Sequence, residues 1–105
     1  MQPRPDPAKL PPMWFIALLH QDNPGSDIGV SFPDLPGCVI AAPTLAKARV
    51  LAEEALRGHL ATMGAAGLPM PEPSTLAAVL EHPDYADSLA LMLVELTIAK
   101  AAEQR

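Results

Sequence analysis

The sequence predicts a small α+β domain in which one long helix packs on a mostly antiparallel sheet, in the order β-β-β-α-(short α)-β. Three short apolar segments rich in branched and aromatic residues come first, a segment with helical periodicity follows, and a last apolar segment lies near the end. The length of 105 residues suffices for one hydrophobic core and not for two. We therefore expect a single domain.

Composition and charge narrow the class of partner. Half of the residues are apolar and 18% are charged, which is typical of a packed globular protein. The formal net charge of -5 argues against unaided binding to a nucleic-acid backbone, because that affinity comes mainly from Lys and Arg side chains. An acidic protein is better suited to a basic partner.

Cysteine content and hydropathy bear on localisation. The single cysteine, Cys38, has no partner for an internal disulfide, and the N-terminal residues lack the apolar segment of a signal peptide. No apolar run approaches the ~20 residues that a membrane-spanning helix needs. We expect a cytoplasmic protein with no membrane association.

The 13 prolines divide the chain into segments. Five of them lie within residues 1–12, which we expect to be an extended or disordered tail. The others fall between apolar segments, where the missing N–H group and the fixed φ of proline do not disrupt a helix or a strand. We expect the folded domain to span residues 13–97 and a C-terminal tail to span residues 98–105.

The first three elements are expected to be strands. Residues 13–20, MWFIALLH, are apolar at nearly every position, as in a central strand covered on both faces, with Phe15 and Ile16 on opposite faces. The turn-forming loop QDNPGSD leads to a half-buried strand at residues 28–32, and a short strand follows at residues 38–42. Two antiparallel hairpins connect them most economically.

A long helix is expected next, because the apolar period changes from two to near 3.6. Thr44 is a suitable N-cap, and Gly64 or Gly67 can adopt the left-handed conformation that ends a helix. The apolar stripe that should cover the sheet consists of Leu45, Ala48, Ala52, Ala55, Leu56, His59, Leu60 and Met63.

The last part of the chain is expected to contain a short helix and a strand. Ser74 is the expected cap of the short helix, which should run through Leu80 and end before Pro83. Residues 88–97, SLALMLVELT, are expected to form a strand, although their Leu, Ala and Met also permit a helix. A right-handed crossover through the long helix would place this strand parallel to and beside the first.

The corner FPDLPGC, which joins the second and third expected strands, is unusually rigid. Pro33 and Pro36 restrict φ, and Gly37 permits a backbone angle that other residues resist. Asp34 can accept a hydrogen bond from a backbone amide within the turn. We expect a turn that fixes the register of two strands, with contact of Asp34 and Leu35 with a partner as the alternative.

The runs WFIALLHQDNPGSDIGVSFPDLPGC, TLAKARVLAEEALRGHL and GLPMPEPSTL resemble the HicB family of antitoxins from bacterial HicA and HicB toxin–antitoxin pairs. The resemblance covers roughly residues 14–96. It implies a partial ribonuclease H-like fold and a type II antitoxin that binds and blocks HicA, a small basic RNA-cleaving protein of double-stranded RNA-binding fold. It also implies a homo-oligomer, which exposed edge strands favour as well.

The resemblance focuses attention on acidic residues that could meet a basic toxin. Asp22 and Asp27 on the first hairpin and Asp34 at the corner are the candidate toxin-facing charges, with Leu35 as a candidate contact. The alternative function is a solitary HicB-like binding module of unknown ligand, or a residual nuclease. Many family members carry a C-terminal DNA-binding domain; because only residues 98–105 follow the last expected strand here, we expect no direct specific DNA binding by this chain.

The sequence contains no recognisable set of residues that could form a catalytic site. Two-metal phosphoryl chemistry needs several convergent carboxylates, and in true ribonuclease H enzymes one comes from the first strand, which here is MWFIALLH and has no acid. Glu53, Glu54 and Glu95 cannot form such a site alone. The three histidines are scattered, and neither a glycine-rich phosphate loop nor a nucleophile elbow is present. We predict that the chain is not an enzyme and binds no metal or cofactor.

Overall fold

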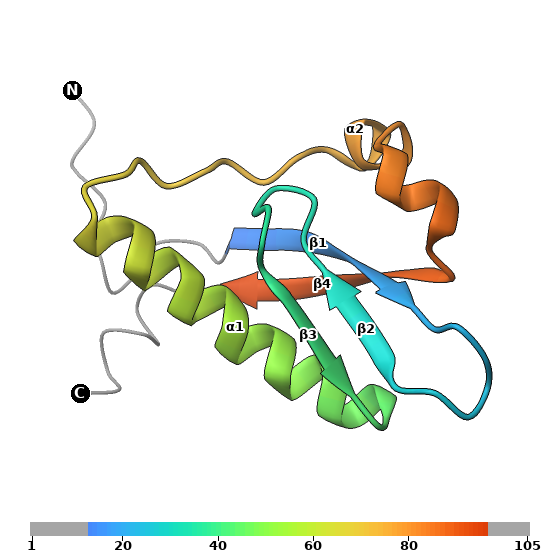
Figure 1. Cartoon of the computed structure of the whole chain (residues 1–105). Helices are drawn as coiled ribbons and strands as arrows, with labels where there is room; N and C mark the ends of the chain where they lie inside the picture. Colours follow the sequence, from blue (N-terminus) through green and yellow to red (C-terminus); the bar gives the residue numbers. More distant parts are fainter. Residues whose placement is uncertain (1–12, 97–105) are drawn as a thin grey trace.

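The computed structural model describes residues 13–96 and contains four strands, one long helix and two short helical elements (Figure 1). In chain order these are β1 (Met13–His20), β2 (Ile28–Ser31), β3 (Val39–Ala42), α1 (Leu45–Ala65), α2 (Leu76–Leu80), the 3-10 helix η2 (Pro83–Asp87) and β4 (Ala90–Leu96). The expected element order and the α+β class are confirmed. The two expected tails, residues 1–12 and 98–105, lie outside the described residues.

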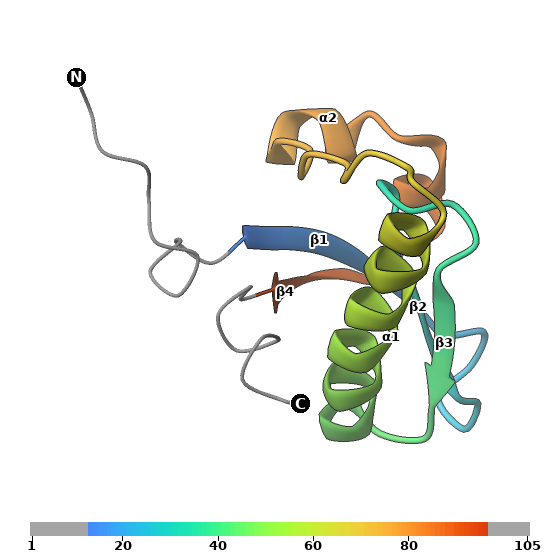
Figure 2. The same cartoon turned by 90° about the vertical axis from the view of Figure 1, so that its left-hand side faces the viewer.

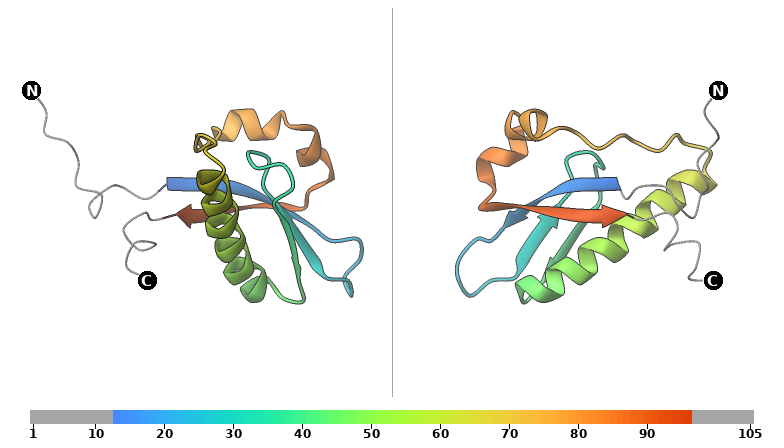
Figure 3. Two further views of the ribbon diagram at one scale, coloured as in Figure 1. Left: turned by 60° about the vertical axis from the view of Figure 1, so that its left-hand side comes forward. Right: turned by 180° about the vertical axis from the view of Figure 1, so that it is seen from behind.

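The strands form one sheet in the order β3-β2-β1-β4, and every neighbouring pair is antiparallel. The register places Leu19 opposite Val30, Val30 opposite Ile40, and Phe15 opposite Val94. The two expected hairpins are confirmed. The two border strands, β3 and β4, can be followed from both sides of the molecule in Figure 3.

The expectation that the last strand runs parallel to the first is wrong, although it does lie beside it. The chain crosses the molecule twice between β3 and β4. After α1, residues 68–75 run back as an extended segment, so α2 and η2 lie at the opposite end and β4 starts from there (Figure 1). The three prolines of this segment cannot continue a helix. We refer to residues 68–75 as the strap.

The two faces of the sheet are covered unequally. On one face, Phe15 and Val30 pack with Ala52 and Leu56 of α1 in the main hydrophobic core. On the other face, α2 contributes a single buried side chain, Val79, which packs against the two β1 residues Ile16 and Leu18. Figure 2 shows α1 and α2 on separate sides of β1 and β4. The predicted alternation of β1 is therefore confirmed, but the second face has little cover.

The boundaries of α1 follow from its caps. The Thr44 hydroxyl accepts a hydrogen bond from the Lys47 amide at 3.1 Å, as expected of an N-cap. At the other end, Gly67 has a φ of +77° and its amide donates to the Gly64 carbonyl, while the Leu68 amide donates to the Met63 carbonyl. This pair of bonds is a Schellman motif. Of the two glycines expected to end the helix, Gly67 does so.

The start of α2 differs from the prediction by one residue. Thr75, and not Ser74, caps the helix, because the Thr75 hydroxyl accepts from the Ala78 amide at 3.2 Å. Ser74 is occupied elsewhere, by the corner between β2 and β3. Among the described residues, none of the helices combines the length and the apolar character needed to cross a membrane.

Candidate partner-binding surface

The corner between β2 and β3 consists of two consecutive turns. The Leu35 amide donates to the Phe32 carbonyl at 3.0 Å, and the Cys38 amide donates to the Leu35 carbonyl at 2.9 Å. Each turn has proline at its second position, Pro33 in residues 32–35 and Pro36 in residues 35–38. The turn at residues 35–38 also has Gly37 at a φ of +90°, as a type II turn requires. The two prolines thus set the path of the chain through both turns.

Leu35 lies where the two turns meet, and its side chain is only 1% exposed. It belongs to the main core together with Cys38, whose thiol pKa is raised by burial. The Leu35 side chain packs inward, which gives it a structural role and leaves little of it exposed for the predicted contact with a partner. Apolar residues at a turn are easily mistaken for contact residues when the direction of the side chain is unknown.

Asp34 connects the corner to the strap. Its carboxylate accepts hydrogen bonds from the Ser74 amide, at 2.9 Å, and from the Ser74 hydroxyl. These groups are partly buried and lie 40 positions apart in the chain. Both carboxylate oxygens are therefore used within the molecule, which gives Asp34 a structural role beside any contact with a partner.

The loop between β1 and β2 holds the other two predicted aspartates outward. The Asn23 side chain accepts from the Gly25 amide at 3.1 Å, and the Gln21 side-chain amide donates to the Ser26 carbonyl at 2.8 Å. Asp22 and Asp27 are exposed on either side of this internally bonded loop. They border a shallow cavity of about 180 Å³, and Asp34 does not take part in it.

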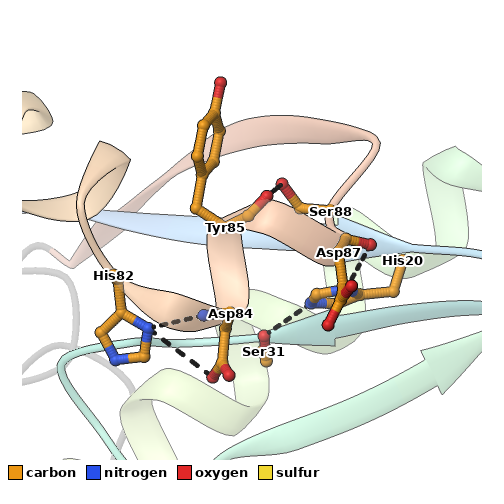
Figure 4. Close-up of polar contacts among 7 residues, drawn as sticks. All are labelled: His20, Ser31, His82, Asp84, Tyr85, Asp87 and Ser88. Carbon is orange, nitrogen blue, oxygen red and sulfur yellow. Dashed lines mark hydrogen bonds and ion pairs between the residues drawn. The ribbon is translucent and has the colours of Figure 1, made fainter.

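A histidine joins this end of β1 to η2 (Figure 4). The His20 ring lies 3.3 Å from the Asp87 carbonyl through Nδ1 and 3.0 Å from the Ser31 hydroxyl through Nε2. A carbonyl oxygen can only accept, so Nδ1 donates, and the neutral ring then accepts from Ser31 through Nε2. The contacts fix η2 against the sheet beside the β1–β2 loop.

A further aspartate, Asp87, therefore lies at the same end of the sheet. Asp84 and Asp87 of η2 are exposed, and the Asp84 carboxylate is 3.8 Å from the His82 ring (Figure 4). Asp87 forms, with Asp22 and Asp27, what we call the acidic end, whereas Asp84 lines a cavity with residues of the corner between β2 and β3. Sequence reasoning missed Asp87, because only the fold brings the end of η2 beside the first hairpin.

Positive charge within the described domain is confined to α1, whose first residue, Leu45, lines a cavity with His20 and Gln21 beside the acidic end. The Lys and Arg side chains within residues 13–96 all lie on α1, and they are Lys47, Arg49 and Arg57. Neither the sheet, the loops, α2 nor η2 carries one in that range. The β1–β2 loop and η2 thus carry carboxylates and no Lys or Arg, which favours the approach of a basic molecule to these two segments.

The glutamates considered for nuclease chemistry do not converge. Glu53 and Glu54 belong to α1, whereas Glu95 alternates on β4 with the core residues Val94 and Leu96. Glu95 therefore points to the sheet face away from α1. Within residues 13–96, no three His, Cys, Asp or Glu side chains are grouped so that they could hold a metal ion.

Comparison with known proteins agrees with this description. Residues 15–105 match the family described as HicB-like antitoxin of bacterial toxin–antitoxin systems. An uncharacterized 14.9 kDa protein of Haemophilus phage HP1, encoded in the rep-hol intergenic region, is 33% identical over 69 residues. That match covers 65% of this chain and 52% of the phage protein, so the chain spans about half the length of this relative.

Two solved structures are similar in fold and sequence. The N-terminal domain of the Burkholderia pseudomallei antitoxin HicB is 28% identical with a TM-score of 0.65, covering 80% of this chain and 98% of that chain. A chain of the HicA3 and HicB3 toxin–antitoxin complex is 26% identical with a TM-score of 0.63, covering 78% of this chain and 95% of that one.

We predict that the Asp34–Ser74 contact stabilises the fold measurably. Asp34→Ala and Ser74→Ala should each lower the free energy of unfolding by about 1–3 kcal/mol, because a partly buried partner loses its hydrogen bonds. The double mutant should lose less than the sum of the single losses, with a coupling energy of about 1 kcal/mol. Urea unfolding of the parent and the three variants gives these values.

The matched control is Asp22→Ala, which removes an exposed carboxylate from the β1–β2 loop and should change stability by no more than about 0.5 kcal/mol. Strict additivity of the two single losses would show that Asp34 and Ser74 do not act together.

Proposed function

Because the chain belongs to the HicB-like antitoxins of bacterial toxin–antitoxin systems, we propose that it binds a HicA-like RNA-cleaving toxin and neutralises it by occluding the toxin's active site. The match of the family to residues 15–105 carries this proposal. The fold shared with a chain of the HicA3 and HicB3 complex supports it. Such an antitoxin would act in the cytoplasm, where the toxin meets its RNA substrates.

The acidic end supplies the electrostatic part of the proposed recognition. Asp22, Asp27 and Asp87 are exposed there, and the Lys and Arg side chains of residues 13–96 lie on α1. Exposed charges at the rim of an interface act mainly on the association rate, and salt screens their effect. Asp34 contributes to the same field, but its hydrogen bonds to Ser74 also give it a stability role.

We predict that the double variant Asp22→Asn and Asp27→Asn associates several-fold more slowly with the cognate HicA-like toxin at low salt, because two charges of the attracting sign are lost. The difference should shrink as ionic strength rises. Surface-based binding kinetics at low and high salt measure both effects.

The matched control removes two carboxylates from α1, in the double variant Glu53→Gln and Glu54→Gln, and should associate at a rate closer to that of the parent. Equal rates for both double variants at every salt concentration would exclude the β1–β2 loop from recognition. Absence of binding by the parent chain would contradict the proposed function itself.

We propose that the four strands and α1 form a partial ribonuclease H-like fold that serves binding and not catalysis. The chain should therefore leave RNA intact in the presence of Mg²⁺ or Mn²⁺, because β1 has no carboxylate and Glu95 faces away from α1. A gel-based cleavage assay of the purified chain checks this. Cleavage that disappears in Glu54→Ala would contradict it.

We also propose that the chain self-associates through the border strand β3. No charged residue occurs between Cys38 and Ala46, so a second copy can pair with β3 without like charges meeting. Val39, 64% exposed, would be covered. Light scattering at micromolar concentration should give a dimer mass or larger for the parent, and a smaller mass for Val39→Lys. A monomeric parent would contradict this.

A further inference from the structure

The other border strand, β4, has properties that differ from those of β3. It is seven residues long and pairs with β1 along its length, and within residues 13–96 no strand lies on its outer side. Among the described strands, the backbone groups on that side have no partner, and such groups can pair with an added strand. Proteins commonly block such an edge with lysine, proline or a bulge, but the sequence ALMLVEL contains neither lysine nor proline.

A row of exposed apolar side chains follows this edge on the sheet face away from α1. Leu91 and Leu93 lie on that face because they alternate with the core-facing Met92 and Val94. Leu93 is 57% exposed. Trp14 of β1, opposite Glu95, extends the row and is itself exposed. We call Trp14, Leu91 and Leu93 the open row.

The open row is uncovered because α2 is short. Its buried residue Val79 packs on Ile16 and Leu18 of β1, which lie directly opposite Leu93 and Leu91 in the register of the two strands. α2 thus covers β1 but does not extend over β4. An apolar row next to an unpaired strand edge can bury the alternate side chains of an added strand.

The charges at the two ends of β4 indicate which kind of partner fits. Asp87 lies just before the strand and Glu95 lies near its end, and both are exposed. A partner segment with Lys or Arg at its ends would meet opposite charges at both places. A second copy paired through β4 would instead bring only carboxylates to this edge, because ALMLVEL and the preceding η2 contain no Lys or Arg.

We propose that β4 is the docking edge for an extended segment of a basic partner, which adds to the sheet as a fifth strand beside the open row. Backbone hydrogen bonds would provide affinity, the open row would receive alternate apolar side chains, and Asp87 and Glu95 would pair with flanking Lys or Arg. This rests on the proposed function for the identity of the partner, a HicA-like toxin, and it assigns the surface that the partner uses.

The first test compares Leu93→Lys with Val50→Lys in equilibrium binding to the cognate toxin. Both positions are about equally exposed, at 57% and 51%, and both variants add one positive charge, but Val50 lies on α1. Leu93→Lys should raise the dissociation constant about tenfold or more, because it places a lysine between β4 and the added strand. Val50→Lys should stay within about twofold of the parent.

The second test needs no variant and so does not depend on Leu93→Lys folding correctly. Hydrogen–deuterium exchange of the parent chain, alone and with the toxin, should slow for residues 90–96 in the complex, since outward amides of β4 become bonded. Unchanged exchange in β4 beside a formed complex would overturn the docking edge while leaving the proposed function intact.

Three other results would also decide the matter. Equal weakening by both lysine variants would overturn the assignment of the surface. A lower mass of free Leu93→Lys than of the free parent in light scattering would show that β4 pairs with a second copy instead. If the toxin does not bind the parent chain at all, the proposed function fails and the docking edge fails with it.

Discussion

The Asp34 carboxylate forms the contact that positions the strap and, through it, α2 and β4. It accepts two hydrogen bonds from Ser74 and so fastens the strap to the corner between β2 and β3. The position of the strap determines where α2 begins, and α2 in turn places Val79 on β1. Because the strap carries the chain back along the molecule, β4 enters the sheet antiparallel to β1. One polar contact thus connects the rigid corner with the direction of the last strand.

Local features of the structure could be predicted well from the sequence. The continuous apolar run in MWFIALLH predicts a strand covered on both faces, and Thr44 and Gly67 mark the ends of α1, because these signals act within a few residues. Features that join distant segments could not be predicted. Ser74 and Thr75 are equally able to cap a helix, and a carboxylate 40 positions away determines which of them does so.

The direction of β4 and the grouping of the acidic residues also depend on distant segments, so neither could be predicted from local sequence. A long helix between two strands usually makes them parallel, and only the extended strap adds the second crossing. Asp22 and Asp27 are recognisable as exposed charges in a turn, but Asp87 joins them only because His20 holds the end of η2 in place. The burial of Leu35 could not be predicted, because the direction of its side chain depends on two turns whose geometry is set by Pro33, Pro36 and Gly37.

The uneven distribution of charge between α1 and the rest of the described domain has a consequence that net charge does not express. A body that is negative throughout attracts a cation equally well in any orientation. Here α1 carries the Lys and Arg side chains of residues 13–96 beside two glutamates, whereas the other segments in that range carry only carboxylates. Such a domain has an electric dipole moment, and a charged neighbour exerts a torque on it. The domain would therefore rotate as it approaches a cationic surface, and collisions that begin with α1 in front would be partly corrected before contact.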